Sequence, residues 1–178
     1  IARLIELGFL GVDEQGGQPV HPFTHPLIQE VCYEGILRAT RQDLHLRTAI
    51  ALEADLPEAT PGYYGMLAYH FVRGNELDSA EECLFKAGDD AARAAASSEA
   101  LQFFQEATRI YLERHGDHAD PEKVALLEAK VALAHYHRGR QLEAIEHMNR
   151  SLVLRGIPIP KGRGPLLRRT AAGIALVL

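Results

Sequence analysis

Histidine and aspartate side chains gather between residues 115 and 120, where their types and spacing could ligate a metal ion. His115 and His118 lie three positions apart, with Asp117 and Asp120 beside them. A zinc site needs three or four ligands that converge with tetrahedral geometry. A polar loop between two helices uses the same residue types without converging them, and we favour that interpretation. The sequence therefore predicts no metal site.

The other histidines with suggestive positions also favour structural roles. His135 and His137 are two residues apart, so on a helix they point to different faces. His25 directly precedes Pro26, and we expect it to make a buried hydrogen bond at a helix start rather than to act in catalysis.

No motif for a nucleophile or for phosphate binding is found along the chain. The loop G-x-x-x-x-G-K-S/T, whose backbone N–H groups cradle phosphates, is absent, and residues 161–164 do not match its spacing. Four serines lie at expected helix caps or repeat positions, without the turn that exposes a hydrolase nucleophile: Ser79, Ser97, Ser98 and Ser151. The sequence predicts no catalytic residue, no cofactor site and no metal in this segment.

Composition excludes some classes of partner. The 178 residues are 47% hydrophobic and 24% charged, with a net charge of −5, which is typical of a soluble globular protein. A nucleic-acid surface usually needs a concentrated positive field, and the basic residues gather only within 150–169, which we interpret as a linker. The apolar run 171–178 is shorter than the ~20 residues of a membrane-spanning helix. We expect a cytoplasmic segment that binds neither nucleic acid nor membrane.

The elements that must position these residues begin with a mixed region, residues 1–54. We expect the end of a helix capped by Gly8, and short β-stretches at 9–12 and 20–23 around a turn. Pro26 suits the first turn of a second helix, and Thr40 with Asp43 resembles a capping box that opens a third helix over 41–54. Helix, hairpin, helix is the order expected at the end of a winged-helix domain.

From residue 62 onward every element is predicted to be helical, giving an all-α fold class overall. Asn75, Ser97 and Asp120 are the expected N-caps. The expected helices are 62–73, 76–95, 98–114, 121–138, 141–154 and 166–178.

Small residues recur at fixed spacing through this helical part. The set Gly88, Ala91, Ala95, Ala100, Phe104 and Ala107 has steps of three, four, five, four and three. Adding 44 to each number gives a second set, Ala132, His135, Gly139, Ala144, Met148 and Ser151. An earlier set has the same steps with one extra residue in the turn: Leu67, His70, Gly74, Ala80, Leu84 and Ala87. Small residues let two antiparallel helices approach to about 8–10 Å.

This spacing resembles the tetratricopeptide repeat, a 34-residue helix–turn–helix unit. Residues 125–158 match it best, and Pro158 ends that unit as the family pattern requires. The resemblance implies an α-solenoid of helical hairpins over 62–160, with 161–178 as the truncated start of a further repeat helix. We expect such a scaffold to bind proteins.

A second resemblance is carried by residues 7–10, the stretch 23–33, several positions in 41–53 and the stretch 152–160. Together they are similar to the junction of winged helix and repeat arm in signal-transduction ATPases with numerous domains. The resemblance implies that residues 1–54 end a winged-helix domain, and that ATP and magnesium are bound only by a domain upstream. Because the sequence starts at Ile1, inside an expected helix, we interpret it as an internal fragment of such a protein.

The expected function is therefore a non-catalytic regulatory segment of a signalling ATPase that docks a protein partner or a neighbouring domain. Two alternatives stay open: the regulatory part of a nucleotide cyclase or protein kinase polypeptide, and the arm of an ATP-dependent transcription regulator. Aromatic residues and arginine are favoured anchors at protein interfaces. The expected interaction surface comprises Tyr63, Tyr64, Tyr69, Phe71 and Arg73.

Overall fold

The computed structural model describes residues 1–15, 18–58 and 60–158, and these residues are mostly helical. The all-α class expected from the sequence is correct, with one small two-stranded antiparallel sheet. The expected helix at 166–178 lies outside the described residues. The helices are α1 (Ala2–Glu6), α2 (Pro26–Glu34), α3 (Arg38–Asp55), α4 (Tyr63–Gly74), α5 (Leu77–Arg93), α6 (Ser97–His115), α7 (Pro121–His137) and α8 (Gln141–Leu154), with a 3-10 helix, η1 (Gly116–His118), between α6 and α7.

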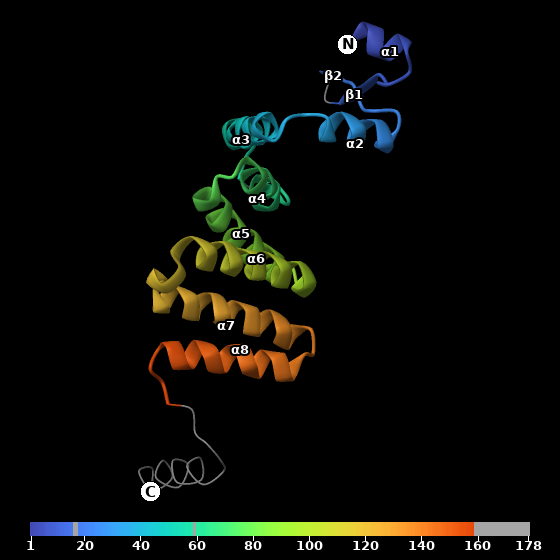
Figure 1. Cartoon of the computed structure of the whole chain (residues 1–178). Coiled ribbons are helices and arrows are strands. Elements are labelled where there is room, and N and C mark those ends of the chain that lie inside the picture. Colours follow the sequence, from blue (N-terminus) through green and yellow to red (C-terminus); the bar gives the residue numbers. More distant parts are fainter. Residues whose placement is uncertain (16–17, 59, 159–178) are drawn as a thin grey trace, which may run out of the picture.

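Residues 1–35 form a small N-terminal lobe at one end of the molecule (Figure 1). Gly8 follows α1 with a left-handed φ of +73°, as expected for a helix-terminating glycine. The strands β1 (Asp13–Gln15) and β2 (Gln18–Val20) lie nearer the turn than expected, and only Val20 of β2 and an isolated Leu10–Phe23 bridge fall in the predicted stretches. Pro22 has no N–H to donate, so the ladder cannot continue there.

The starts of the next two helices show one expectation correct and one wrong. Pro26 is the first residue of α2, as predicted. The capping box at Thr40 does not form, because α3 begins at Arg38 and the Arg41 N–H closes its first turn on the Leu37 carbonyl at 2.9 Å. Thr40 therefore lies inside the helix.

Helices α3 to α8 are stacked one after another, and each packs on its neighbours in sequence (Figure 1). Among the described residues, buried side chains occur only within this stack, from Ala49 onward. One core cluster joins residues of α3, α4, α5, α6 and α7, and a second joins α5, α6 and α7 around Phe104. A stack of this kind is stabilised mainly by contacts between adjacent elements.

Among the described glycines, Gly88 of α5 lies closest to a side chain of a neighbouring helix. A Cβ atom placed on Gly88 would lie 2.5 Å from Cε1 of Phe104 in α6, and Phe104 is only 1% exposed. Gly88 and Phe104 both belong to the spaced set found in the sequence, and here they meet across the two helices. It lets α5 and α6 pack around one aromatic ring.

Three turns of the stack have the same backbone and hydrogen-bond pattern. Each contains one left-handed residue: Asn75 (φ +60°), Ala95 (φ +59°) and Gly139 (φ +74°). Its N–H donates to the carbonyl three residues earlier, and the next N–H donates to the carbonyl five residues before it. This arrangement satisfies carbonyl groups at the end of each preceding helix.

Aligning the three left-handed residues corrects the first repeat set. The true equivalents are Ala68, Phe71, Asn75, Ala80, Leu84 and Ala87, which have the same steps as the other two sets. The expected assignment of Leu67, His70 and Gly74 was one residue early, and the first turn contains no extra residue. All of the corrected positions except the turn residue Asn75 are buried.

The observed helix starts show which of the expected N-caps are correct. Asp120 is correct: its carboxylate accepts from the Glu122 N–H at 3.1 Å. Asn75 is wrong, since it ends α4 rather than starting α5. Ser97 is also wrong, because it is the first residue of α6 and Ala96 holds the cap position.

Exchanging the residue types of two equivalent turns tests this alignment. Ala95→Gly is expected to raise the free energy of unfolding and Gly139→Ala to lower it, each by about 0.5–1 kcal/mol, because a left-handed backbone penalises Cβ. Urea denaturation followed by circular dichroism measures both. Ala51→Gly, at an exposed interior position of α3, is the control and should cost about 1 kcal/mol. If Ala95→Gly costs as much as this control, residue 95 does not hold the left-handed turn.

Candidate interaction surface

The five residues expected to form one surface are separated by the structure. Tyr63 and Phe71 are 8% and 3% exposed and belong to the core, because α4 packs against both α3 and α5. Their inclusion in an interaction surface was wrong. Tyr64, Tyr69 and Arg73 are at least partly exposed, but they lie in two different places.

Tyr69 and Arg73 are neighbours on the side of α4 that meets α3. The guanidinium carbon of Arg73 lies 3.7 Å from the centre of the Tyr69 ring. The same Tyr69 ring meets the ring of His45 in α3 edge to face, with centroids 5.9 Å apart. This pair therefore lies where α4 packs on α3.

Tyr64 lines a groove between the start of α4, the end of α5 and the start of α6. We call it the first groove; it encloses about 720 Å³. Tyr64 and Phe103 are half-buried in its lining, and Gly65, Ala87 and Ala91 contribute small side chains. Aromatic and small residues together leave room for an apolar side chain of a partner.

The first groove carries carboxylates that are not neutralised. Asp90 and Arg93 form an ion pair at its rim. The exposed side chains of Glu58 and Glu99 also line it, and neither makes an ion pair with any described residue. The first groove is therefore apolar inside, with free negative charge at its edge.

A second groove, of about 760 Å³, lies between α5 and α7. Its acidic residues are paired: Glu81, only 5% exposed, meets Lys123 at 2.6 Å and Arg114 at 3.5 Å. Glu122 lies 3.4 Å from Arg155. Glu81 lies on α5, Arg114 on α6 and Lys123 on α7, so this network mainly joins the three helices. Removing one partner would leave a buried charge without its counter-ion. The second groove therefore has fewer unpaired carboxylates that could bind a ligand than the first groove has.

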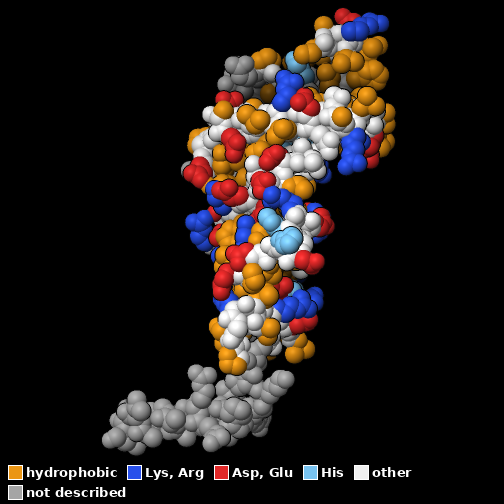
Figure 2. All heavy atoms as spheres, turned by 60° about the vertical axis from the view of Figure 1, so that its left-hand side comes forward, with side chains coloured by type: hydrophobic (Ala, Val, Ile, Leu, Met, Phe, Trp, Pro, Cys, Tyr) orange, Lys and Arg blue, Asp and Glu red, His pale blue; other side chains and the backbone are white. Residues whose placement is uncertain are grey.

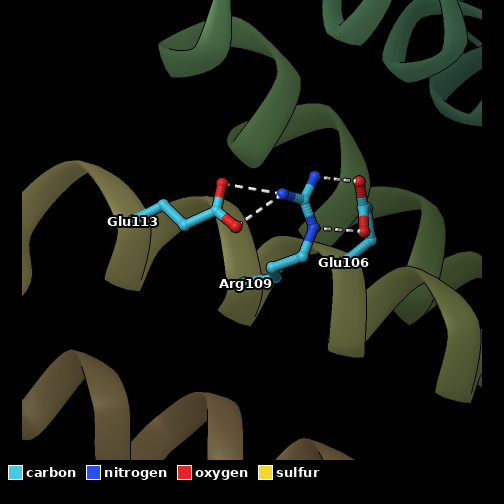
Figure 3. A network of polar contacts seen from close by, with 3 residues as sticks. All are labelled: Glu106, Arg109 and Glu113. Atoms are coloured by element: carbon cyan, nitrogen blue, oxygen red, sulfur yellow. Dashed lines mark hydrogen bonds and ion pairs between the residues drawn. The ribbon is translucent and has the colours of Figure 1, made fainter.

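The charge cluster on α6 stabilises a single helix. Figure 3 shows Arg109 between Glu106 and Glu113, donating two hydrogen bonds to each carboxylate at 2.5–2.9 Å. These bonds raise the pKa of Arg109, and the bond from Arg109 lowers the pKa of Glu106. Such pairs at three and four residues add only about 0.2–0.5 kcal/mol each. The cluster is an exposed helix surface with its charges already satisfied.

The candidate histidines are placed differently from what their spacing suggested. Within the described residues no group of three or more possible ligands surrounds a metal position, including His115 and His118. His25 is exposed and its side chain makes no capping hydrogen bond, so the expected buried bond was wrong. His135 is 8% exposed, which lowers its pKa, and its ring stacks at 5.3 Å on His147 of α8.

Two residues of the first groove that the sequence did not indicate, Glu99 and Phe103, lie on a different helix from Tyr64. Phe103 and Glu99 follow Tyr64 by more than thirty positions, and they come together because α5 packs on both α4 and α6. The sequence feature that could best have indicated this contact is Gly65, because a Cβ there would lie 3.4 Å from the Phe103 ring.

Hydrophobic side chains also lie over the N-terminal lobe, at the top of the view in Figure 2. Leu27 and Val31 of α2 are each 72% exposed. Among the helices described, none combines the length and hydrophobicity needed to cross a membrane.

Comparison with known proteins relates the chain to part of one longer protein. No family model matches the sequence, and no solved structure matches it. A protein of Rhizobium meliloti (strain 1021), described as uncharacterized, is 35% identical over 104 residues. The match covers 58% of this chain but 10% of that protein, so the similar region spans about a tenth of the relative's length.

Proposed function

We propose that the chain is a non-catalytic interaction segment of a larger protein, and that its first groove docks a protein segment carrying basic and apolar side chains. The observation that carries this proposal is the pairing of an apolar lining, Tyr64 and Phe103, with the free carboxylates of Glu58 and Glu99. A lysine or arginine flanked by an apolar residue complements both features.

The repeated geometry supports a tetratricopeptide-like α-solenoid as the scaffold. Three equivalent turns and helices packed on their sequence neighbours are what such a repeat requires. The order α1, hairpin, α2 at the N-terminus is compatible with the end of a winged helix. We propose the solenoid as the docking unit and residues 1–35 as its link to preceding sequence.

The larger protein, in our proposal, is a signalling ATPase of the class named above, in which this segment docks a partner or a neighbouring domain. The basis is the resemblance of the junction residues. The much greater length of the Rhizobium meliloti relative is compatible with a multidomain parent.

Charge reversal at the groove edge tests the proposed function. Peptides selected from a displayed random library on the wild-type chain are expected to be enriched in lysine or arginine beside apolar residues. The double variant Glu58→Lys/Glu99→Lys should weaken a selected synthetic peptide about tenfold or more, since a charge-assisted contact contributes about 1.5–3 kcal/mol. Fluorescence anisotropy of the labelled peptide gives the affinity.

The matched control is Glu30→Lys/Asp117→Lys, which makes the same change in net charge on exposed residues outside the first groove. Its affinity for the peptide should stay near that of the wild type. Selection of peptides without basic residues, or equal weakening by both double variants, would contradict docking in the first groove.

A further inference from the structure

The N-terminal lobe is held on the stack by very few polar contacts. Among the described residues, two side-chain contacts join residues 1–35 to the helices that follow. The Tyr33 hydroxyl of α2 lies 2.9 Å from Nε2 of His45 in α3. Glu34 pairs with Arg41 at 2.9 Å, and the Arg41 guanidinium carbon lies 4.9 Å from the centre of the Tyr33 ring.

His45, the partner of Tyr33, makes a second hydrogen bond to a helix of the stack. His45 Nδ1 lies 3.0 Å from His70 Nδ1 of α4, so one chain of hydrogen bonds joins α2, α3 and α4. Two nitrogens at this distance share one proton. If His45 carries it at Nδ1, that N–H donates to His70 Nδ1 while His45 Nε2 accepts from the Tyr33 hydroxyl, so one arrangement of protons satisfies both contacts.

We propose that the Tyr33–His45–His70 chain is a latch that fixes the N-terminal lobe, together with α3, on α4, and that it opens between His45 and His70 when both histidines take up protons. A first added proton can still be shared along the chain. A second puts an N–H on both facing Nδ1 atoms, which removes the hydrogen bond and sets two positive charges against each other.

The positive charges around the latch disfavour the addition of protons to its two histidines. Arg41 from α3 and Arg73 from α4 flank the histidines, while Tyr69 from α4 and Tyr33 from α2 face them as neutral rings. The Glu34 carboxylate of α2 is paired with Arg41.

These surroundings set the sign of the pH dependence. Burial, then His70, Arg73 and Arg41, lower the pKa of His45, and burial and Arg73 lower the pKa of His70. The closed form therefore binds fewer protons than a form with free histidines, whose pKa is about 6.5. Its contribution is fully present above about pH 6.5 and is lost as the pH falls through the lowered values.

Distance measurement between spin labels tests the latch. One label goes on Cys32, which is exposed on α2, and the other on α6 through Gln102→Cys. Burial raises the pKa of the Cys83 thiol to about 11, so Cys83 stays unlabelled. The wild-type latch should give one narrow distance distribution at about pH 7.5, and a second, broader population should grow at about pH 5.

Tyr33→Phe removes only the hydroxyl and should raise the open-to-closed ratio about two- to tenfold at the higher pH. The controls are Tyr136→Phe and His118→Gln, which change exposed side chains on α7 and η1, away from the latch residues, and should leave the distribution unchanged. Circular dichroism confirms that the stack stays folded, since its core contains neither Tyr33 nor His45. A wild-type distribution that does not change with pH overturns the proton-driven opening, and a Tyr33→Phe distribution identical to the wild type overturns the latch itself.

Discussion

Replacing Phe104 with alanine is expected to lower the free energy of unfolding by about 3–5 kcal/mol. The Phe104 side chain is 1% exposed and lies in the second core cluster, where it meets the Phe85 ring edge to face at 5.9 Å. Its loss leaves a cavity between α5, α6 and α7 that the neighbouring backbones cannot fill. Because adjacent helices supply most of the stability of such a stack, one cavity weakens two interfaces.

Urea denaturation followed by circular dichroism measures this loss. Leu112→Ala, on the same helix but 39% exposed, is the control and should cost clearly less. A Phe104→Ala variant no less stable than the Leu112→Ala variant would show that the packing around Phe104 is loose.

Gly88→Ala is expected to destabilise the protein by about 1–3 kcal/mol, although alanine normally favours a helix. The added Cβ would lie 2.5, 2.7 and 2.9 Å from three atoms of the Phe104 ring, so α5 and α6 must move apart. The measurement is again the free energy of unfolding in urea.

A helical glycine with more room provides the control for this substitution. At Gly65 the new Cβ would lie 3.4 Å from the Phe103 ring, so Gly65→Ala should be neutral or stabilise by up to about 1 kcal/mol. Adding Phe104→Leu to Gly88→Ala should recover part of the loss, because the smaller side chain makes space. If both alanine variants stabilise the protein, the close approach at Gly88 is not what holds α5 and α6 together.

The sequence predicted those parts of the fold that depend on local chemistry. Pro26 and the Asp120–Pro121 pair gave correct helix starts, since proline and an aspartate cap act within one turn. Gly139, which has the left-handed backbone favourable to glycine, gave a correct helix end.

The errors arose where a residue adopts an unfavoured backbone. Ala95 is left-handed although alanine resists that conformation, and Asn75 ends a helix although asparagine also favours N-caps. The one-residue error in the first repeat followed from Asn75. At Ala95 the packing of adjacent helices overrides local preference, whereas at Asn75 the left-handed helix end is itself a preference of asparagine.

The candidate surface and the latch depend on contacts between distant segments. Tyr63 and Tyr64 are adjacent in sequence, yet packing on α5 buries the first and leaves the second at the edge of the first groove. His45 and His70 are 25 positions apart and meet only because α3 packs on α4. No pattern of residue types along the chain indicates either meeting.

Amide chemical-shift mapping tests docking in the first groove most directly. The isotope-labelled wild-type chain is titrated with the selected basic–apolar peptide while backbone amide resonances are followed. Docking in the first groove predicts the largest shift changes at Tyr64, Ala91, Glu99 and Phe103, with little change on the α5–α7 side at Glu82 and Leu126. Changes confined to the α5–α7 side, or to the exposed face of α8, would contradict the proposal that the first groove is the docking site.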